Sequence, residues 1–61
     1  MTNFEMVNYA LKGAREEYRH YINEQRVAEG TPKERFYSSL RHQTYKDIKE
    51  LEKELEHLNA E

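Results

Sequence analysis

Cysteine and tryptophan are absent from this 61-residue sequence, and proline occurs only once. Without cysteine the chain forms neither a disulfide nor a thiolate zinc site, which is typical of proteins of the reducing cytoplasm. No run approaches the roughly 20 apolar residues of a membrane span, and the N-terminus lacks the basic-then-apolar pattern of a signal peptide. We therefore expect a cytoplasmic protein that has no membrane partner and consists of one small domain, residues 1–61.

Excess charge of one sign is also lacking, since the formal net charge is −2. This balance gives no reason in itself to expect a nucleic-acid or membrane partner. The charges are nevertheless unevenly distributed. Residues 12–49 carry nine Lys or Arg against six Asp or Glu, whereas residues 50–61 carry one Lys against five Glu. The middle of the chain is mildly basic and its tail is acidic.

The residues that interrupt helices lie mainly at the middle of the chain. Gly30 suits the C′ position after a helix, and Thr31 suits the N-cap of the next, with the single proline following at the first helical position. Glu34 lies three residues after Thr31 and completes a capping box, and Thr2 with Glu5 has the same form. These signals predict a first helix over about 3–29, a turn at 30–31 and a second helix over about 32–59.

Apolar residues recur every three or four positions, which places one stripe on each predicted helix. The first stripe is Phe4, Val7, Leu11, Ala14, Tyr18, Tyr21, Gln25 and Ala28. The second stripe is Tyr37, Leu40, Thr44, Ile48, Leu51, Leu55 and Leu58. The positions of the two stripes are symmetric about Thr31, so that Leu11 is expected to face Leu51. The sequence therefore predicts an all-α fold, an antiparallel helical hairpin with coiled-coil character.

Two helices cover each other's apolar stripes only in part, so the expected hairpin needs further helices. A second copy would supply them and form a homodimeric four-helix bundle with C2 symmetry. The alternative is that another protein covers the apolar stripes. In outline the expected fold is similar to the Rop-type plasmid regulators, which are hairpins of about this size. The likeness is one of architecture, because no motif is shared.

No group of residues has the pattern of a catalytic site. Ser38 and Ser39 are the only serines, and His42 lies one turn away on the same predicted helix. They have no orienting acid and no oxyanion hole. Gly13 and Gly30 stand alone, so there is no glycine-rich phosphate loop. We expect no enzymatic activity and no cofactor.

Two Glu-x-x-His pairs have the spacing that di-iron four-helix bundles use to ligate metal, namely Glu17 with His20 and Glu54 with His57. Both histidines fall outside the apolar stripes, and no carboxylates on the other helix complete a ligand set. We interpret them as solvated surface histidines and expect no metal site.

A partial basic stripe runs along the first predicted helix and consists of Lys12, Arg15, Arg19 and Arg26. Such a face can bind a nucleic-acid backbone, and Rop-type hairpins bind paired RNA. Acidic neighbours reduce the effect, since Glu16 lies one turn from Lys12 and is expected to pair with it. Nucleic-acid binding is therefore the alternative function, and a salt-bridged solvent face is the simpler interpretation.

Exposed aromatic and apolar residues fit a protein partner better. Met6 and Tyr9 lie off the stripe of the first helix, on its outer face, and more aromatic residues lie near the turn than one hairpin can bury. The expected contacts are Met6, Tyr9, Tyr18, Tyr21, Phe36, Tyr37 and Tyr45. These residues could equally form the dimer seam. We expect a small non-enzymatic regulator or inhibitor that presents a helical surface to a larger protein, a type common among accessory reading frames of bacteria and phages.

Overall fold

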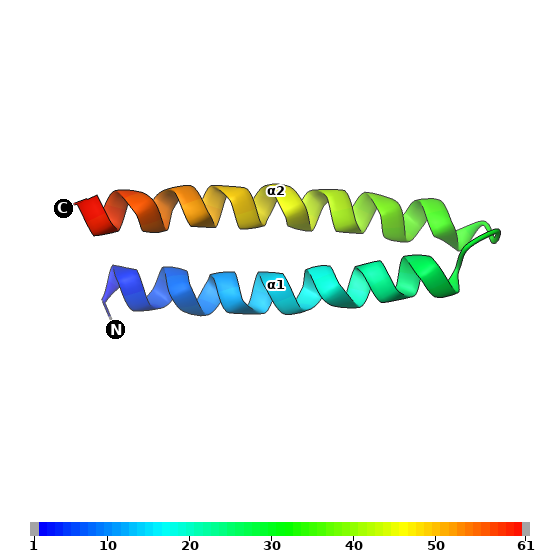
Figure 1. Ribbon diagram of the computed structural model, residues 1–61, viewed down its shortest axis with the longest axis horizontal. Helices are drawn as coiled ribbons and strands as arrows, with labels where there is room; N and C mark the ends of the chain where they lie inside the picture. The colour runs from blue at the N-terminus through cyan, green and yellow to red at the C-terminus, as the bar shows by residue number, and fades with distance from the viewer. Residues whose placement is uncertain (1, 61) are drawn as a thin grey trace.

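The computed structural model describes residues 2–60, which form two antiparallel α-helices joined by one turn (Figure 1). Helix α1 spans Asn3–Val27 and helix α2 spans Lys33–Ala60. The two helices lie side by side, and the start of α1 and the end of α2 lie together opposite the turn (Figure 1). The Cα atoms extend over 47 × 16 × 11 Å. The predicted helical hairpin is confirmed.

The start of α1 follows the capping chemistry that the sequence predicts. Thr2 has extended backbone angles, with φ −75° and ψ 161°, and its side-chain oxygen accepts a hydrogen bond from the Glu5 N–H at 3.2 Å. The Thr2 carbonyl accepts the next bond, from the Met6 N–H at 3.0 Å. Thr2 therefore satisfies a backbone N–H group that has no partner within the helix.

The turn differs from the predicted capping box. Helix α1 ends at Val27, two residues earlier than expected, and Gly30 has a φ of +82°. The Thr31 hydroxyl does not cap α2 but donates to the Ala28 carbonyl at 2.6 Å, and the Thr31 N–H donates to the same oxygen at 2.9 Å. Because that amide is already paired, the Glu34 carboxylate accepts a bond from the Gly30 N–H instead, at 3.1 Å.

The two predicted stripes form the seam between the helices. Val7 and Leu11 of α1 are buried, as are Thr44 and Ile48 of α2. The remaining seam residues are half-buried, apart from Phe4 at the open end, which is exposed, and Ala28 at the turn, which is buried. The hydroxyl of the buried Thr44 donates a hydrogen bond to the Leu40 carbonyl at 2.8 Å, so this polar group has a partner within the helix.

The hairpin leaves a large surface exposed to solvent. Its accessible surface is 5131 Å² for a mass of 7.4 kDa. A compact monomer of that mass would expose about 4,200 Å², so the elongated hairpin exposes roughly 900 Å² more. Neither α1 nor α2, over the residues described, is long and apolar enough to cross a membrane.

Candidate interaction surfaces

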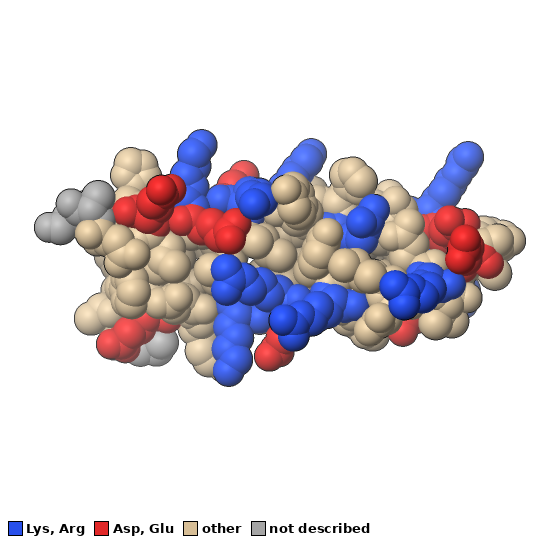
Figure 2. All heavy atoms as spheres, viewed as in Figure 1, with Lys and Arg blue, Asp and Glu red and all other residues tan. Residues whose placement is uncertain are grey.

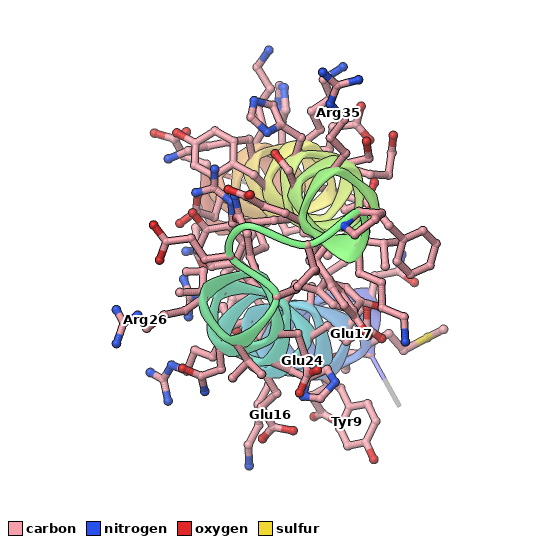
Figure 3. The ribbon with its side chains drawn as sticks, turned by 90° about the vertical axis from the view of Figure 1, so that its right-hand side faces the viewer. Tyr9, Glu16, Glu17, Glu24, Arg26 and Arg35 are labelled. Atoms are coloured by element: carbon pink, nitrogen blue, oxygen red, sulfur yellow. The ribbon has the colours of Figure 1, made fainter. Side chains whose placement is uncertain are left out.

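The hairpin has two broad sides of different charge, because three basic residues of α1 line a hollow on one side, whereas Glu17 of α1 and three carboxylates of α2 line a groove on the other. Figure 3 shows this division at two labelled positions, where Arg26 and Glu17 lie on opposite sides of α1. In Figure 2 the blue Lys and Arg atoms gather along α1 over the middle of the viewed face. Each side carries a candidate surface.

The basic side contains three of the four residues predicted to face nucleic acid. Lys12, Arg15 and Arg19 line one shallow hollow of about 490 Å³, together with Asn8 and Glu16. The structure does not bring Arg26 into this group.

Arg26 lies nearer the turn, where it lines another hollow with the acidic residues Glu29 and Glu34. The predicted basic stripe is therefore continuous over its first three members and is followed by a mixed-charge region. A stripe of that length covers the middle of α1 only.

One ion pair on this side connects the two helices, and a second lies within α2. Arg15 Nη2 lies 3.4 Å from Glu52 Oε2 across the seam, and Lys49 Nζ lies 3.4 Å from the other oxygen of that carboxylate. No Lys12–Glu16 pair is formed in the part of the chain that the structure describes. Lys12 and Glu16 both extend into solvent, where a pair contributes little. The expected Lys12–Glu16 pair is therefore not formed, although Glu16 lines the same hollow as Lys12.

Tyr18 and Tyr45 meet across the seam beside the basic stripe. Their ring centroids are 6.1 Å apart with planes inclined at 43°, and Lys49 Nζ lies 5.3 Å from the Tyr45 ring centroid. The two rings line a small hollow of about 200 Å³ with Arg41 and His42. Arg41 Nε is buried and has no hydrogen-bond partner in the protein.

Arg41 was not among the predicted contacts. Its spacing of one helical turn from Tyr45 is the signal that would have found it, because residues four apart share a helix face.

The other predicted contact residues lie in separate places. Phe36 and Tyr37 pack edge to face near the turn with centroids 5.3 Å apart, and 60% of Phe36 is exposed. Tyr21 is half-buried and its ring lies 5.7 Å from that of His20. The aromatic residues near the turn therefore form small pairs and not one continuous patch.

Met6 and Tyr9 occupy the outer face of α1, as predicted. Met6 is 54% exposed and Tyr9 is 75% exposed. Figure 3 shows the Tyr9 ring pointing away from α2. Neither residue contributes to the seam, so both are available to a partner. Val27 is exposed to a similar degree and was not predicted as a contact.

The acidic side carries a groove between the helices that the sequence reasoning missed. Its floor consists of Ala10, Gly13 and Ala14 of α1 with Leu51 of α2, and its volume is about 430 Å³. Its rim consists of the four carboxylates Glu17, Asp47, Glu50 and Glu54. A Cβ atom added to Gly13 would meet nothing within 4 Å, so the floor is open. Ala10 lies three and four residues before Gly13 and Ala14, and this helical spacing is the signal that would have indicated the groove.

The first Glu-x-x-His pair does not form a joint site. Glu17 lines this groove, as does Glu54 of the second pair, whereas His20 lies beside Tyr21. Within the described residues, no three His, Asp or Glu side chains are arranged so that they could hold a metal ion together.

Comparisons with protein-family models, with curated proteins and with solved structures found no match to this chain. The proposed function therefore rests on the surfaces described above.

Proposed function

We propose that this chain is a small, non-enzymatic regulator or inhibitor that acts in the cytoplasm by presenting a helical surface to a larger protein. The observation that carries the proposal is the exposure of large apolar and aromatic side chains on a chain with a very thin core. The aromatic residues and Met among them are Phe4, Met6, Tyr9, Phe36 and Tyr45. Aromatic residues and Met are enriched at protein interfaces, where they bury much area at low entropic cost.

The exposed surface also supports association. The excess of about 900 Å² over a compact monomer is close to the roughly 800 Å² that each partner contributes to a standard interface. We infer that the hairpin forms a homodimer and that two copies build a C2-symmetric four-helix bundle. The side that carries Tyr18 and Tyr45 suits this contact. This side carries both a positive and a negative charge, because Arg15 lies beside Glu52. In a two-fold symmetric dimer, the basic residues of one copy can therefore face the acidic residues of the other.

A binding experiment with matched baits tests the protein-binding function. The immobilised chain is exposed to lysate and to chemical cross-linking, beside baits carrying Tyr9→Ala, Phe36→Ala or the control Val27→Ala. Tyr9→Ala should leave the melting temperature unchanged, because Tyr9 makes no seam contact. We expect a target that is retained by wild type and Val27→Ala and is lost from at least one of the other two baits. Retention of no protein, or equal retention by all four baits, contradicts the proposal.

Nucleic-acid binding is the second candidate, favoured by one specific observation. Lys12, Arg15 and Arg19 share a hollow, and the Tyr18–Tyr45 pair lies on the same side of the hairpin. Cationic side chains beside exposed aromatic rings are the combination that binds single strands and loops.

A salt titration tests this second candidate. Binding to DNA or RNA should fall steeply with salt concentration and should be lost in Arg15→Glu/Arg19→Glu, but not in Lys53→Glu, which changes charge outside the hollow. No binding of either nucleic acid at low salt removes the candidate.

A further inference from the structure

We propose that the groove on the acidic side is the docking site for a cationic helix of the target protein. This helix would present a stripe of apolar residues flanked by Lys or Arg. The inference rests on the proposed protein-binding function and names the partner's chemistry. It also assigns target binding to the side of the hairpin opposite the proposed dimer contact.

The floor of the groove has the shape that a third helix requires. Helices pack with their axes 8–10 Å apart, and the closest approach needs small side chains at the contact. On the α1 side of the floor lie three small residues, Ala10, Gly13 and Ala14. On the α2 side the half-buried Leu51 supplies an apolar contact. The open space above Gly13 leaves room for a side chain of the incoming helix.

The carboxylates on the rim of the groove favour a partner that carries positive charge. Glu17 lines one edge and Asp47, Glu50 and Glu54 line the other, and among the described residues no Lys or Arg lines it. These carboxylates flank the floor as the e and g positions flank the seam of a coiled coil, where charged pairs select partner and orientation. Lys or Arg at the matching positions of an incoming helix would pair with them.

The α1 cations do not neutralise this rim from within the chain. Lys12, Arg15 and Arg19 line the hollow on the basic side, and Arg15 is paired with Glu52 there. The groove itself is lined by four carboxylates and no cation, although Glu50 also lines a neighbouring hollow with Lys49 and Lys53 of α2. Such a lining attracts a cationic partner and repels an anionic one.

A second copy of this chain does not supply the matching helix. Two grooves placed face to face would bring together eight carboxylates with no cation between them. The outward faces of the helices do not fit either, since the exposed large apolar residues of α2 within the described part are Phe36 and Tyr45, nine residues apart. Tyr9 and Val27 are exposed near opposite ends of α1, so they form no continuous apolar stripe flanked by bases. The occupant is therefore a different protein.

Two synthetic helical peptides with the same Ala/Leu stripe test the proposal, one flanked by Lys and Arg and the other by Glu. Their binding to the full chain is measured by calorimetry at several salt concentrations. We expect the cationic peptide to bind at least about tenfold more tightly than the acidic one. Gly13→Leu fills the floor and should weaken binding by about tenfold, since it removes the close approach of the backbones.

Further variants separate the groove from general charge attraction. Glu17→Gln/Glu54→Gln keeps the shape of the rim, and should weaken binding of the cationic peptide and flatten its salt dependence. Glu16→Gln changes the charge of α1 by one unit outside the groove and should leave binding unchanged. Gly13→Leu should remain folded, because Leu favours helix and its Cβ lies in open space, and circular dichroism checks this.

Each contrary result has a definite meaning. Failure of the cationic peptide to bind, or equal binding by wild type and Gly13→Leu, overturns the groove as the docking site. So does a groove substitution that changes the oligomeric state instead, because a second copy would then be the occupant. A lysate target retained equally by wild-type and Gly13→Leu baits would overturn the groove and leave the protein-binding function intact. Selective peptide binding without any lysate target would contradict the proposed function alone.

Discussion

Tyr18 of α1 and Tyr45 of α2 contact each other across the hairpin with ring centroids 6.1 Å apart. Their positions are almost symmetric about Thr31, as the alignment of the two apolar stripes requires. The Arg15–Glu52 ion pair joins the same side of the two helices nearer the open end. Together the two contacts define how α1 and α2 are aligned along the hairpin axis.

The tyrosine pair should contribute a measurable coupling free energy. In a double-mutant cycle with Tyr18→Leu and Tyr45→Leu, we expect coupling of about 0.5 kcal/mol, the lower end for aromatic pairs because Tyr45 is about half exposed. Urea denaturation of the four proteins measures it. Strictly additive losses would show that the rings do not interact in solution.

The two glycines should respond to alanine with opposite signs. Gly30→Ala places a Cβ at a φ of +82° and should destabilise the hairpin by about 1–2 kcal/mol. Gly13→Ala lies within α1 with open space around the new Cβ and should stabilise it by about 0.5–1 kcal/mol. Thermal denaturation compares both with wild type. A loss of stability in Gly13→Ala would mean that the floor of the groove is already occupied in a dimer.

Aspartate substitutions should distinguish the roles of the two threonines. Thr2 accepts a hydrogen bond, so Thr2→Asp should keep or slightly raise stability, as carboxylates are good N-caps. Thr31 donates to the Ala28 carbonyl, and Asp has no proton to give, so Thr31→Asp should cost about 1 kcal/mol. Thr31→Ser keeps the donor and is the control. Unchanged stability in Thr31→Asp would indicate that this side chain caps α2 after all.

Leucine truncation should show how much of the seam one hairpin buries. Leu11 is 3% exposed, and Leu11→Ala should cost about 2–5 kcal/mol. Leu51 is half-buried, so Leu51→Ala should cost roughly half as much in the monomer. Chemical denaturation at several protein concentrations, with sedimentation equilibrium alongside, measures both losses. Equal costs that rise with concentration would place Leu51 inside the homodimer interface and leave the groove unavailable to another protein.

Local signals in the sequence determined most of the fold. The spacing of residues such as Leu11 and Ile48 places each on one helix face, and both are buried as that spacing predicts. Thr2 caps α1, and Gly30 takes the positive φ of the turn. The exposure of Met6 and Tyr9 follows from the same helical periodicity. These features depend on backbone geometry and on residues close in sequence, which a single chain displays directly.

The tertiary structure decided which distant side chains meet. Arg15 pairs with Glu52 of the other helix, because the packing of α2 against α1 brings this carboxylate within reach. Helix α1 ends early, at Val27, and the Thr31 N–H donates to the Ala28 carbonyl. The Glu34 carboxylate therefore accepts a hydrogen bond from the Gly30 N–H. The groove likewise exists only once Gly13 and Leu51 lie on facing helices. Each of these features depends on the relative position of two helices, which helical periodicity alone leaves open.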